Sequence, residues 1–326
     1  MQPPRPLPID VIIPTRNRGA SLTRTLLSLL ADANPQLRIW VVDQSDGDAT
    51  ARAVQPFCHQ DERVHYLQTP TRGISSARNL GAQRGAAPYV LFTDDDCRAA
   101  PGWASALATE LADGGAWAAF GRLLPEWRGA APPARWAAAL PLAIKRSEAR
   151  EVYAGNPRQL GFGHGASMGV RRERLEALGG FDEALGVGGP LRSWEDRDLG
   201  HRILHTGGQI VYTPRALTYH QQRNHPAEVY ATFYDYGIGA GATAAKYLRC
   251  GDPVGAAILG DWLLGQGLRQ MLSGLVKWRC WPKTAVGLQQ LAVTWQGMAL
   301  GLRYPVDQAR RLYLAPGSAL AQKATW

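Results

Sequence analysis

Short apolar runs alternate with amphipathic segments along the first hundred residues of the chain. Runs of β-branched and aromatic residues predict buried strands at residues 9–13, 38–42, 64–67 and 88–93. Apolar residues at helical spacing predict helices at residues 21–30, 49–57 and 74–84. Because strands and helices that alternate at this pitch form right-handed crossovers, we expect an α/β fold with a doubly wound, mostly parallel sheet.

The alternation becomes less regular after residue 100. A stretch rich in alanine, proline and tryptophan predicts an irregular surface excursion at residues 125–141. Around this stretch the pattern predicts strands at residues 116–123 and 209–213, the second of which ends before Pro214, and regularity returns at residues 165–170. It also predicts helices at residues 103–111, 171–178 and 195–205.

The region after about residue 226 is rich in alanine, glycine, leucine and tryptophan, and it predicts a helical C-terminal extension. Two apolar stripes at helical spacing run through it. They are Leu264, Leu268, Met271 and Leu275, and then Leu288, Leu291, Ala292, Trp295, Met298, Ala299 and Leu302. Basic amphipathic helices with tryptophan suit an anionic membrane surface. The same stripes would equally suit packing on the main domain or on the second subunit of a homodimer.

Composition limits the class of protein. The 326 residues allow about two domains of ~150 residues each. A hydrophobic content of 45% with 19% charged residues excludes a disordered or collagen-like chain. The four cysteines form no CxxC pair and no zinc-type cluster with histidine, which predicts reduced thiols in a reducing compartment. The first apolar run is too short for a signal peptide, and the best candidate span, residues 284–302, carries three glutamines, so we expect a cytoplasmic protein.

Most of the net charge of +9 lies near the C-terminus. Residues 262–326 contain eight lysines and arginines and a single acidic residue, Asp307, which gives this segment a charge of +7. This charge accompanies tryptophan-rich amphipathic helices, which suits a lipid surface better than nucleic acid. We therefore expect no nucleic-acid partner, and we consider a peripheral position on the inner face of the cell membrane.

Three consecutive aspartates, Asp94, Asp95 and Asp96, follow the strand predicted at residues 88–93. Strand alternation places Asp94 and Asp96 on one side, ~6.6 Å apart along the strand. Such carboxylates repel one another unless a cation lies among them, and Mg²⁺ or Mn²⁺ takes ligands of this kind together with substrate phosphates. The carboxyl ends of parallel strands are also where doubly wound sheets bind ligands. A solvated acidic turn is the alternative.

Other polar residues at the ends of predicted elements are further candidates. Asp43 ends the second strand, where it either hydrogen-bonds a nucleobase or ribose or serves as a turn residue. Asp196 is either a base held ionised by a helix N-terminus or, with Ser193, part of a capping box. His220 becomes relevant if the three aspartates hold a metal. Neither GxGxxG nor GxxxxGK[ST] occurs, which weighs against a dehydrogenase-type dinucleotide fold and a P-loop.

In their order along the chain, these segments resemble the inverting family 2 glycosyltransferases, enzymes of the GT-A fold. The resemblance covers roughly residues 10–220, about two thirds of the chain. It rests on VIIPTRNR at 11–18, VVD at 41–43, GISSARN at 73–79, DDD at 94–96, GGFDE at 179–183, EDRDL at 195–199 and His220. Each segment is weak alone, but the ordered set is specific, and it favours the role of base for Asp196.

The resemblance implies a nucleoside-diphosphate sugar as donor and a divalent metal, Mn²⁺ or Mg²⁺, as cofactor. The donor nucleotide would be bound by Pro14, Thr15, Arg16, Asp43, Arg78, Asn79, Asp94 and Asp95. Asp96 and His220 would ligate the metal, Asp196 would be the catalytic base and Glu195 its acceptor-binding neighbour. Residues 1–226 would then form a GT-A domain, with a nucleotide-binding half at 1–100 and an acceptor-binding half at 101–226. Residues 227–326 would form the helical region.

The implied reaction is the transfer of a hexosyl group to an acceptor hydroxyl, with inversion at the anomeric carbon. The acceptor would be a saccharide or a lipid-linked glycan, and the product would be a cell-surface polysaccharide or glycolipid. A sugar-nucleotide nucleotidyltransferase is one alternative. It would release pyrophosphate, and it usually has a glycine-rich basic loop after its first strand, which the run at residues 14–19 resembles only faintly. A non-catalytic carbohydrate-binding protein is the other alternative, and it would need neither a base nor a metal.

Overall fold

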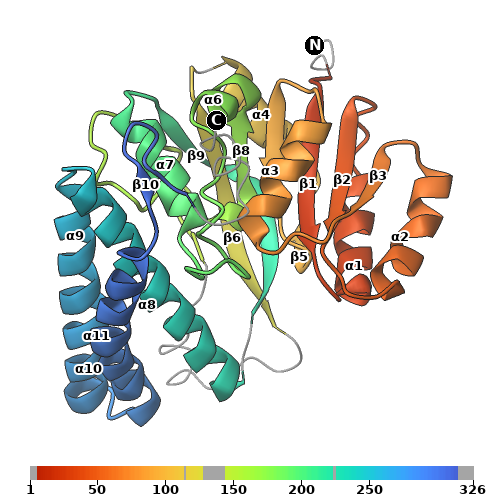
Figure 1. Cartoon of the computed structure of the whole chain (residues 1–326). Helices are drawn as coiled ribbons and strands as arrows, with labels where there is room; N and C mark the ends of the chain where they lie inside the picture. The colour runs from red at the N-terminus through yellow and green to blue at the C-terminus, as the bar shows by residue number, and fades with distance from the viewer. Residues whose placement is uncertain (1–5, 114, 128–143, 223–224, 315–326) are drawn as a thin grey trace. The chain divides into compact units, whose positions relative to one another are not determined.

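The computed structural model describes residues 6–113, 115–127, 144–222 and 225–314 (Figure 1). These residues belong to two compact units. The first contains the described residues up to Glu126 together with residues 144–181 and Leu199–Gln221. The second contains Trp127, Asp182–Asp198 and the described residues from Gln222 onward. The division of function at residues 100 and 226 stays a prediction.

The first unit is an α/β structure, as predicted (Figure 1). Its strands are β1 (Ile9–Thr15), β2 (Leu37–Asp43), β3 (Val64–Gln68), β4 (Tyr89–Phe92), β5 (Cys97–Ala99), β6 (Ala118–Trp127), β7 (Glu151–Tyr153), β8 (Met168–Arg171) and β9 (Ile210–Gln222). Its helices are α1 (Gly19–Leu30), α2 (Ala49–Gln60), α3 (Ile74–Arg84), α4 (Trp103–Asp113) and α6 (Arg172–Ala177), with the 3₁₀ turn η1 (Gly165–Ser167). Helix α7 (Glu195–His205) starts in the second unit and ends in the first. The excursion predicted at residues 125–141 lies, beyond Trp127, outside the described residues.

The strands form one sheet in the order β3-β2-β1-β4-β8-β6-β9-β5, and β7 pairs with β9. Strands β3, β2, β1 and β4 are parallel, as crossovers through helices require. Antiparallel pairs are found beyond β4, where β8 joins β4 and β6, and where β5 and β7 join β9. The parallel strands are thus those of the N-terminal strand–helix repeats.

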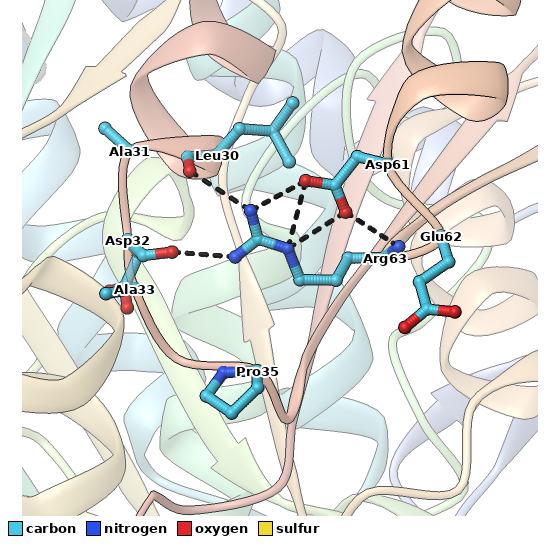
Figure 2. A pocket seen from close by; sticks show the side chains of 8 residues that line it. All are labelled: Leu30, Ala31, Asp32, Ala33, Pro35, Asp61, Glu62 and Arg63. Atoms are coloured by element: carbon cyan, nitrogen blue, oxygen red, sulfur yellow. Dashed lines mark hydrogen bonds and ion pairs between the residues drawn. The ribbon is translucent and has the colours of Figure 1, made fainter.

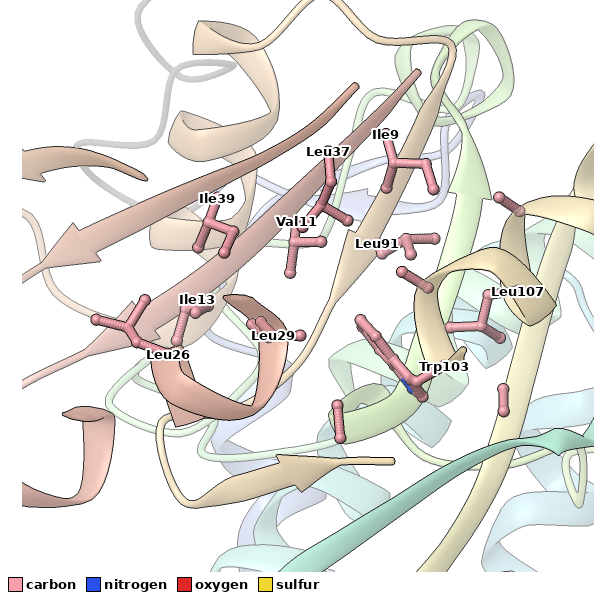
Figure 3. Close-up of a cluster of buried hydrophobic side chains, with 14 of the residues drawn as sticks. Ile9, Val11, Ile13, Leu26, Leu29, Leu37, Ile39, Leu91, Trp103 and Leu107 are labelled. Carbon is pink, nitrogen blue, oxygen red and sulfur yellow. The ribbon is translucent and has the colours of Figure 1, made fainter. Parts of the chain in front are cut away.

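Helices cover both faces of this sheet, and alternate residues of β1 separate the two cores. On one face Ile9, Val11 and Ile13 pack with leucines of α1 and with Trp103 and Leu107 of α4 (Figure 3). On the other face Ile12 packs in a second cluster with residues of α3, α6 and α7. Since side chains alternate along a strand, the apolar residues of β1 serve both cores.

Two strands continue through prolines at which the sequence predicted them to end. β1 runs through Pro14 to Thr15. Its pairing with β4 ends at Ile12, so Pro14 lies beyond that pairing. β9 runs through Pro214, which lies between its pairing with β7, at residues 210–212, and its pairing with β5, at residues 218–220. Proline is tolerated where a strand needs no N–H donor. The longer β9 carries His220, which the sequence placed after the strand.

The second unit is mainly helical, which confirms the predicted extension. Its elements are α8 (Pro226–Arg249), α9 (Val254–Gly260), the π-helical η2 (Asp261–Arg269), α10 (Gln270–Leu272), the π-helical η3 (Ser273–Lys277), α11 (Trp281–Gly301), β10 (Val306–Asp307) and β11 (Leu312–Tyr313). Within the described part of the chain, every helix is too short or too polar to cross a membrane.

Helices α8 and α11 pack through glycines instead of the predicted apolar stripes. A Cβ atom on Gly241 would lie 1.9 Å from the Thr294 carbonyl oxygen, and one on Gly297 would lie 2.2 Å from that of Ile238. The buried face of α11 is Thr284, Val286, Gly287, Gln290, Val293, Thr294, Gly297 and Gly301. Trp295, in the second stripe, is 54% exposed. The stripes are therefore not what holds the helical unit together.

Candidate active site

The carboxyl ends of β1 and β4 bring the first candidate residues together. β1 ends at Thr15, and after β4 the chain turns through the three aspartates into β5. The Thr15 hydroxyl donates a hydrogen bond of 2.8 Å to Asp95 Oδ2. Burial raises the pKa of the Asp95 carboxyl to about 6, although the Arg18 guanidinium opposes this rise. Asp95 thus anchors the aspartate turn to β1 from a buried position.

Asp94, Asp96 and His220 lie close enough to share one metal ion. Pairing of β5 with β9 places Cys97 opposite His220. His220 Nε2 consequently lies 3.3 Å from Asp96 Oδ1. Asp94, Asp96, Cys97 and His220 each offer a ligand atom within 4.8 Å of the other three. Carboxylate oxygens are the ligands that Mg²⁺ and Mn²⁺ prefer, while a thiol suits softer metals, so the two aspartates and the histidine fit a hard divalent ion.

Arg18 is a residue of this site that the sequence analysis missed. Its Nη1 lies 3.0 Å from Asp95 Oδ1 and 3.0 Å from Asp96 Oδ2, so it offsets part of their negative charge. The side chain is 45% exposed, which leaves it accessible to an anion. Arg18 lies in the same PTRNR run as Arg16, the residue that was predicted to bind the donor. Arg16 instead forms an exposed ion pair of 3.0 Å with Asp46.

Arg78 and Asn79 lie beside the aspartates but make internal contacts. Arg78 is buried, and its Nη2 lies 3.0 Å from Asp94 Oδ1. The Asn79 amide donates to the Phe181 carbonyl at 2.9 Å and accepts from the Phe181 N–H at 2.8 Å. This geometry favours positioning roles, with Arg78 orienting Asp94 and Asn79 holding Phe181, over the predicted direct contacts with the nucleotide.

Asp43, the predicted nucleoside contact, is fully buried at the end of β2. Its Oδ1 accepts from the Ser45 N–H at 2.8 Å, and its Oδ2 accepts from the Tyr66 hydroxyl at 2.7 Å. Burial, and then the bond to Asp43, raise the pKa of the Tyr66 hydroxyl, which keeps it protonated as a donor. A nucleobase would reach Asp43 only if Tyr66 or Ser45 moved aside. Pro14 is buried in β1 and offers no donor of its own.

Glu195 and Asp196 open helix α7 in the second unit. The Asp196 carboxylate accepts a hydrogen bond of 2.7 Å from the Arg197 N–H, and Glu195 is buried. The two residues that flank Ser193 have positive φ, 74° at Arg192 and 78° at Trp194. Left-handed backbone at residues other than glycine costs about 1–3 kcal/mol each and is concentrated at functional sites. The Ser193 N–H donates to the Leu191 carbonyl and not to the Asp196 carboxylate, as a capping box would require. The Ser193 hydroxyl donates to the Asp235 carbonyl.

A buried charge network holds the segment that contains these two acids. Lys246 of α8 lies 2.6 Å from Asp182 Oδ2 and 2.5 Å from Asp198 Oδ1, and all three side chains are fully buried. The Tyr247 hydroxyl donates to Asp198 at 2.6 Å, and the Tyr313 N–H donates to Asp182 at 2.9 Å. Burial raises the pKa of the Asp182 carboxyl, and Lys246 opposes the rise. One lysine therefore ties both ends of Asp182–Asp198 to the C-terminal helices.

A groove in the first unit lies at the opposite ends of the parallel strands, before β2 and β3 (Figure 2). Arg63 crosses it, pairs with Asp61 at 2.8 Å and donates to the carbonyls of Leu30 and Asp32 (Figure 2). The guanidinium thus joins two loops. Ligands of parallel sheets bind at the carboxyl ends of the strands, so this groove is not the candidate site.

The chain matches the family model "Glycosyl transferase family 2" over residues 10–179, slightly more than half of its length. The chain belongs to glycosyltransferase family 2. The matched segment contains Asp94 and Asp96 of the candidate metal site, while His220 lies beyond it. The resemblance stated from the sequence is confirmed.

This family 2 glycosyltransferase is similar in sequence to named bacterial and archaeal glycosyltransferases. It is 28% identical to the pre-mycofactocin glycosyltransferase of Mycobacterium tuberculosis (strain CDC 1551 / Oshkosh) over 272 residues, which are 81% of this chain and 54% of the relative. It thus spans about half the length of that relative. It is 24% identical to the glucosyl-dolichyl phosphate glucuronosyltransferase of Haloferax volcanii over 241 residues, 70% of this chain and 72% of the relative.

A solved structure confirms the fold. The mannosyltransferase PcManGT from Pyrobaculum calidifontis, in complex with GDP-Man and Mn²⁺, matches with a TM-score of 0.61 over 92% of this chain and 88% of its own. The two sequences are 17% identical. At this level the likeness concerns the fold, and it confirms the expected GT-A architecture.

Proposed function

We propose that this glycosyltransferase is a metal-dependent, inverting enzyme that transfers a hexosyl group from a nucleoside-diphosphate sugar to an acceptor hydroxyl. The observation that carries the proposal is the convergence of Asp94 and Asp96, which follow the parallel strand β4, with His220 of β9, their ligand atoms lying within 4.8 Å of one another. These residues come from two chain segments more than a hundred residues apart, and their donor set fits Mn²⁺ or Mg²⁺.

Asp94, Asp96 and His220 would hold the metal, and it would offset the negative charge that develops on the leaving diphosphate. Arg18, already beside Asp96, would add a second positive charge near the phosphates. Thr15 and Arg78 would keep Asp95 and Asp94 in place. The Mn²⁺ and GDP-Man in the structure of PcManGT support this choice of cofactor and donor class.

Asp196 would act as the base and Glu195 would bind the acceptor. The Asp196 carboxylate takes the proton of the acceptor hydroxyl as that oxygen bonds to the anomeric carbon. The bond between this carbon and the diphosphate oxygen breaks on the opposite face, so the nucleoside diphosphate leaves and the anomeric centre inverts. Support comes from the position of Asp196 in the first turn of α7 and from the left-handed backbone before it.

The acceptor would be a saccharide or lipid-linked glycan of the cell surface, and the protein would act at the cytoplasmic side of the membrane. Support comes from the Haloferax relative, whose name gives glucosyl-dolichyl phosphate as its acceptor.

A product assay tests the proposal against the nucleotidyltransferase and carbohydrate-binding alternatives. Incubation with UDP-, GDP- and dTDP-sugars, Mn²⁺ and acceptor is expected to release a nucleoside diphosphate, and EDTA is expected to stop the release. Asp96→Ala should show the same loss, while Asp48→Ala, at an exposed carboxylate of an ion pair with Arg52, should not. Release of pyrophosphate, or full turnover in EDTA, would contradict the proposal.

A further inference from the structure

Large apolar side chains are exposed at the turn between η3 and α11. This tip, defined as residues 272–283, contains Leu272, Leu275, Val276, Trp278 and Trp281, whose exposed fractions run from 37% for Trp278 to 73% for Val276. The exposed stripe continues on both helices that meet at the tip, at Leu264 and Leu268 of η2 and at Leu288 of α11. Single exposed apolar residues are ordinary, but a continuous group of this kind marks an interaction surface.

Glycines explain why these side chains point outward. A Cβ atom on Gly287 of α11 would lie 2.3 Å from the Met271 backbone nitrogen, and one on Gly274 would lie 2.6 Å from that of Thr284. The segment from η2 to η3 therefore meets α11 backbone to backbone. With small residues filling the contact, the leucines and tryptophans are left on the outer surface. Small residues inside and large apolar residues outside is the arrangement of helices that contact lipid.

The tip also has a strong positive charge. Residues 262–303 contain five lysines and arginines and no aspartate or glutamate. Lys277 and Lys283 lie over the Trp278 ring, with their Nζ atoms 5.6 and 5.4 Å from its centroid. Arg279 follows directly and is exposed. Cations and tryptophan rings thus share one short turn, and no acidic side chain within the segment offsets the charge.

This combination discriminates among possible occupants. A second copy of the chain would bring the same cations against each other, at a cost in repulsion. An anionic bilayer has the complementary charge, and its interface is where tryptophan and lysine are both favoured. Since no described helix is both long and apolar enough to span a bilayer, the fitting mode is a helical hairpin lying in the headgroup region.

We propose that the tip at residues 272–283 inserts into the interface of an anionic membrane, with the apolar residues in the acyl boundary and Lys277, Arg279 and Lys283 on the headgroup phosphates. The surface needs neither donor nor metal. The proposal is therefore independent of the proposed catalytic function, and a failure of one leaves the other testable.

Vesicle sedimentation with the full chain tests the proposal. Vesicles of phosphatidylcholine with about 30 mol% phosphatidylglycerol serve as the anionic membrane. The fraction of the chain bound to them should exceed the fraction bound to vesicles of phosphatidylcholine alone by at least about tenfold. Lys277→Gln with Arg279→Gln should lower it by about 30-fold, because each charge contributes about fivefold. Trp278→Ser with Trp281→Ser should lower it by roughly tenfold or more.

Matched variants in the first unit control for general surface effects. Leu27→Ser, at a leucine that is 58% exposed in α1, and Arg84→Gln, at an exposed arginine that ends α3, should bind the anionic vesicles like the unmodified chain. Equal sedimentation with and without vesicles, or tip variants that bind as the controls do, would overturn the proposal. The proposal would also be overturned if sedimentation equilibrium showed that the unmodified chain is a dimer and that the tryptophan variant is a monomer. The tip would then contact a second copy of the chain.

Discussion

Asp196→Asn is expected to lower kcat by a factor of about 10²–10⁴ while nucleotide affinity stays nearly unchanged. Asparagine keeps the size of the side chain and its bond from the Arg197 N–H, but it cannot take the acceptor proton. The loss should therefore lie in kcat and not in binding of the donor. Steady-state kinetics with the donor from the product assay measures the first quantity, and thermal shift with nucleoside diphosphate and Mn²⁺ measures the second.

Glu195→Gln is the matched comparison, because it changes the adjacent carboxylate to an amide at the same helix end. As an acceptor-binding residue, Glu195 should affect the KM for the acceptor more than kcat. Full activity in Asp196→Asn would contradict the role of Asp196 as base. The role would also be contradicted if both variants lost kcat equally and Asp196→Asn no longer bound nucleotide.

Lys246→Met is expected to destabilise the second unit by about 3–5 kcal/mol, because it leaves two buried carboxylates without their cation. Methionine is similar in length and apolar, so packing changes little and the loss reports the charges. Equilibrium unfolding in urea, followed by tryptophan fluorescence, measures it. Because Lys246 holds both ends of Asp182–Asp198, we also expect activity to fall with stability.

Arg249→Met is the control for Lys246→Met, since Arg249 is exposed near the end of the same helix and should cost about 0.5 kcal/mol. Adding Asp182→Asn and Asp198→Asn to Lys246→Met should recover part of the stability, because the buried charges are then removed together. If Lys246→Met were no less stable than Arg249→Met, the network would not be the anchor described here.

The elements of the first unit could be predicted from the sequence because each carries a local signal. The run Ile9–Ile13 is apolar except at Asp10, and β1 does lie between two cores. The helix predicted at residues 74–84 is α3 with the same ends. Of the antiparallel strands, β5 and β7 had no comparable signal, since they have three residues each and their pairing with β9 depends on distant chain segments.

The candidate site could be predicted in part. Asp96 and His220 came from a resemblance, and the pairing of β5 with β9 gives the physical reason for their proximity. Arg18 and Arg16 are two residues apart in one loop, and only the fold distinguishes the one beside the aspartates from the one that pairs with Asp46. Asn79 has the residue type of a ligand, and its bonds to the Phe181 backbone appear only in three dimensions.

In the helical unit, the sequence pattern did not indicate which helix face is buried. Apolar residues at helical spacing normally mark a buried face. In α11 the buried face is instead set by Gly287, Gly297 and Gly301, which allow close contact between backbones. Periodicity found the stripes correctly but could not assign them to the inside or the outside of the unit.

The most direct test of the account is anomalous diffraction at the manganese edge, from crystals grown with Mn²⁺ and a nucleoside diphosphate. We expect one manganese peak within about 2.5 Å of an Asp96 carboxylate oxygen and of His220 Nε2, with diphosphate oxygens completing its ligands. A bound nucleoside diphosphate with no manganese at Asp96 and His220, or with the manganese held by other residues, would contradict the central claim.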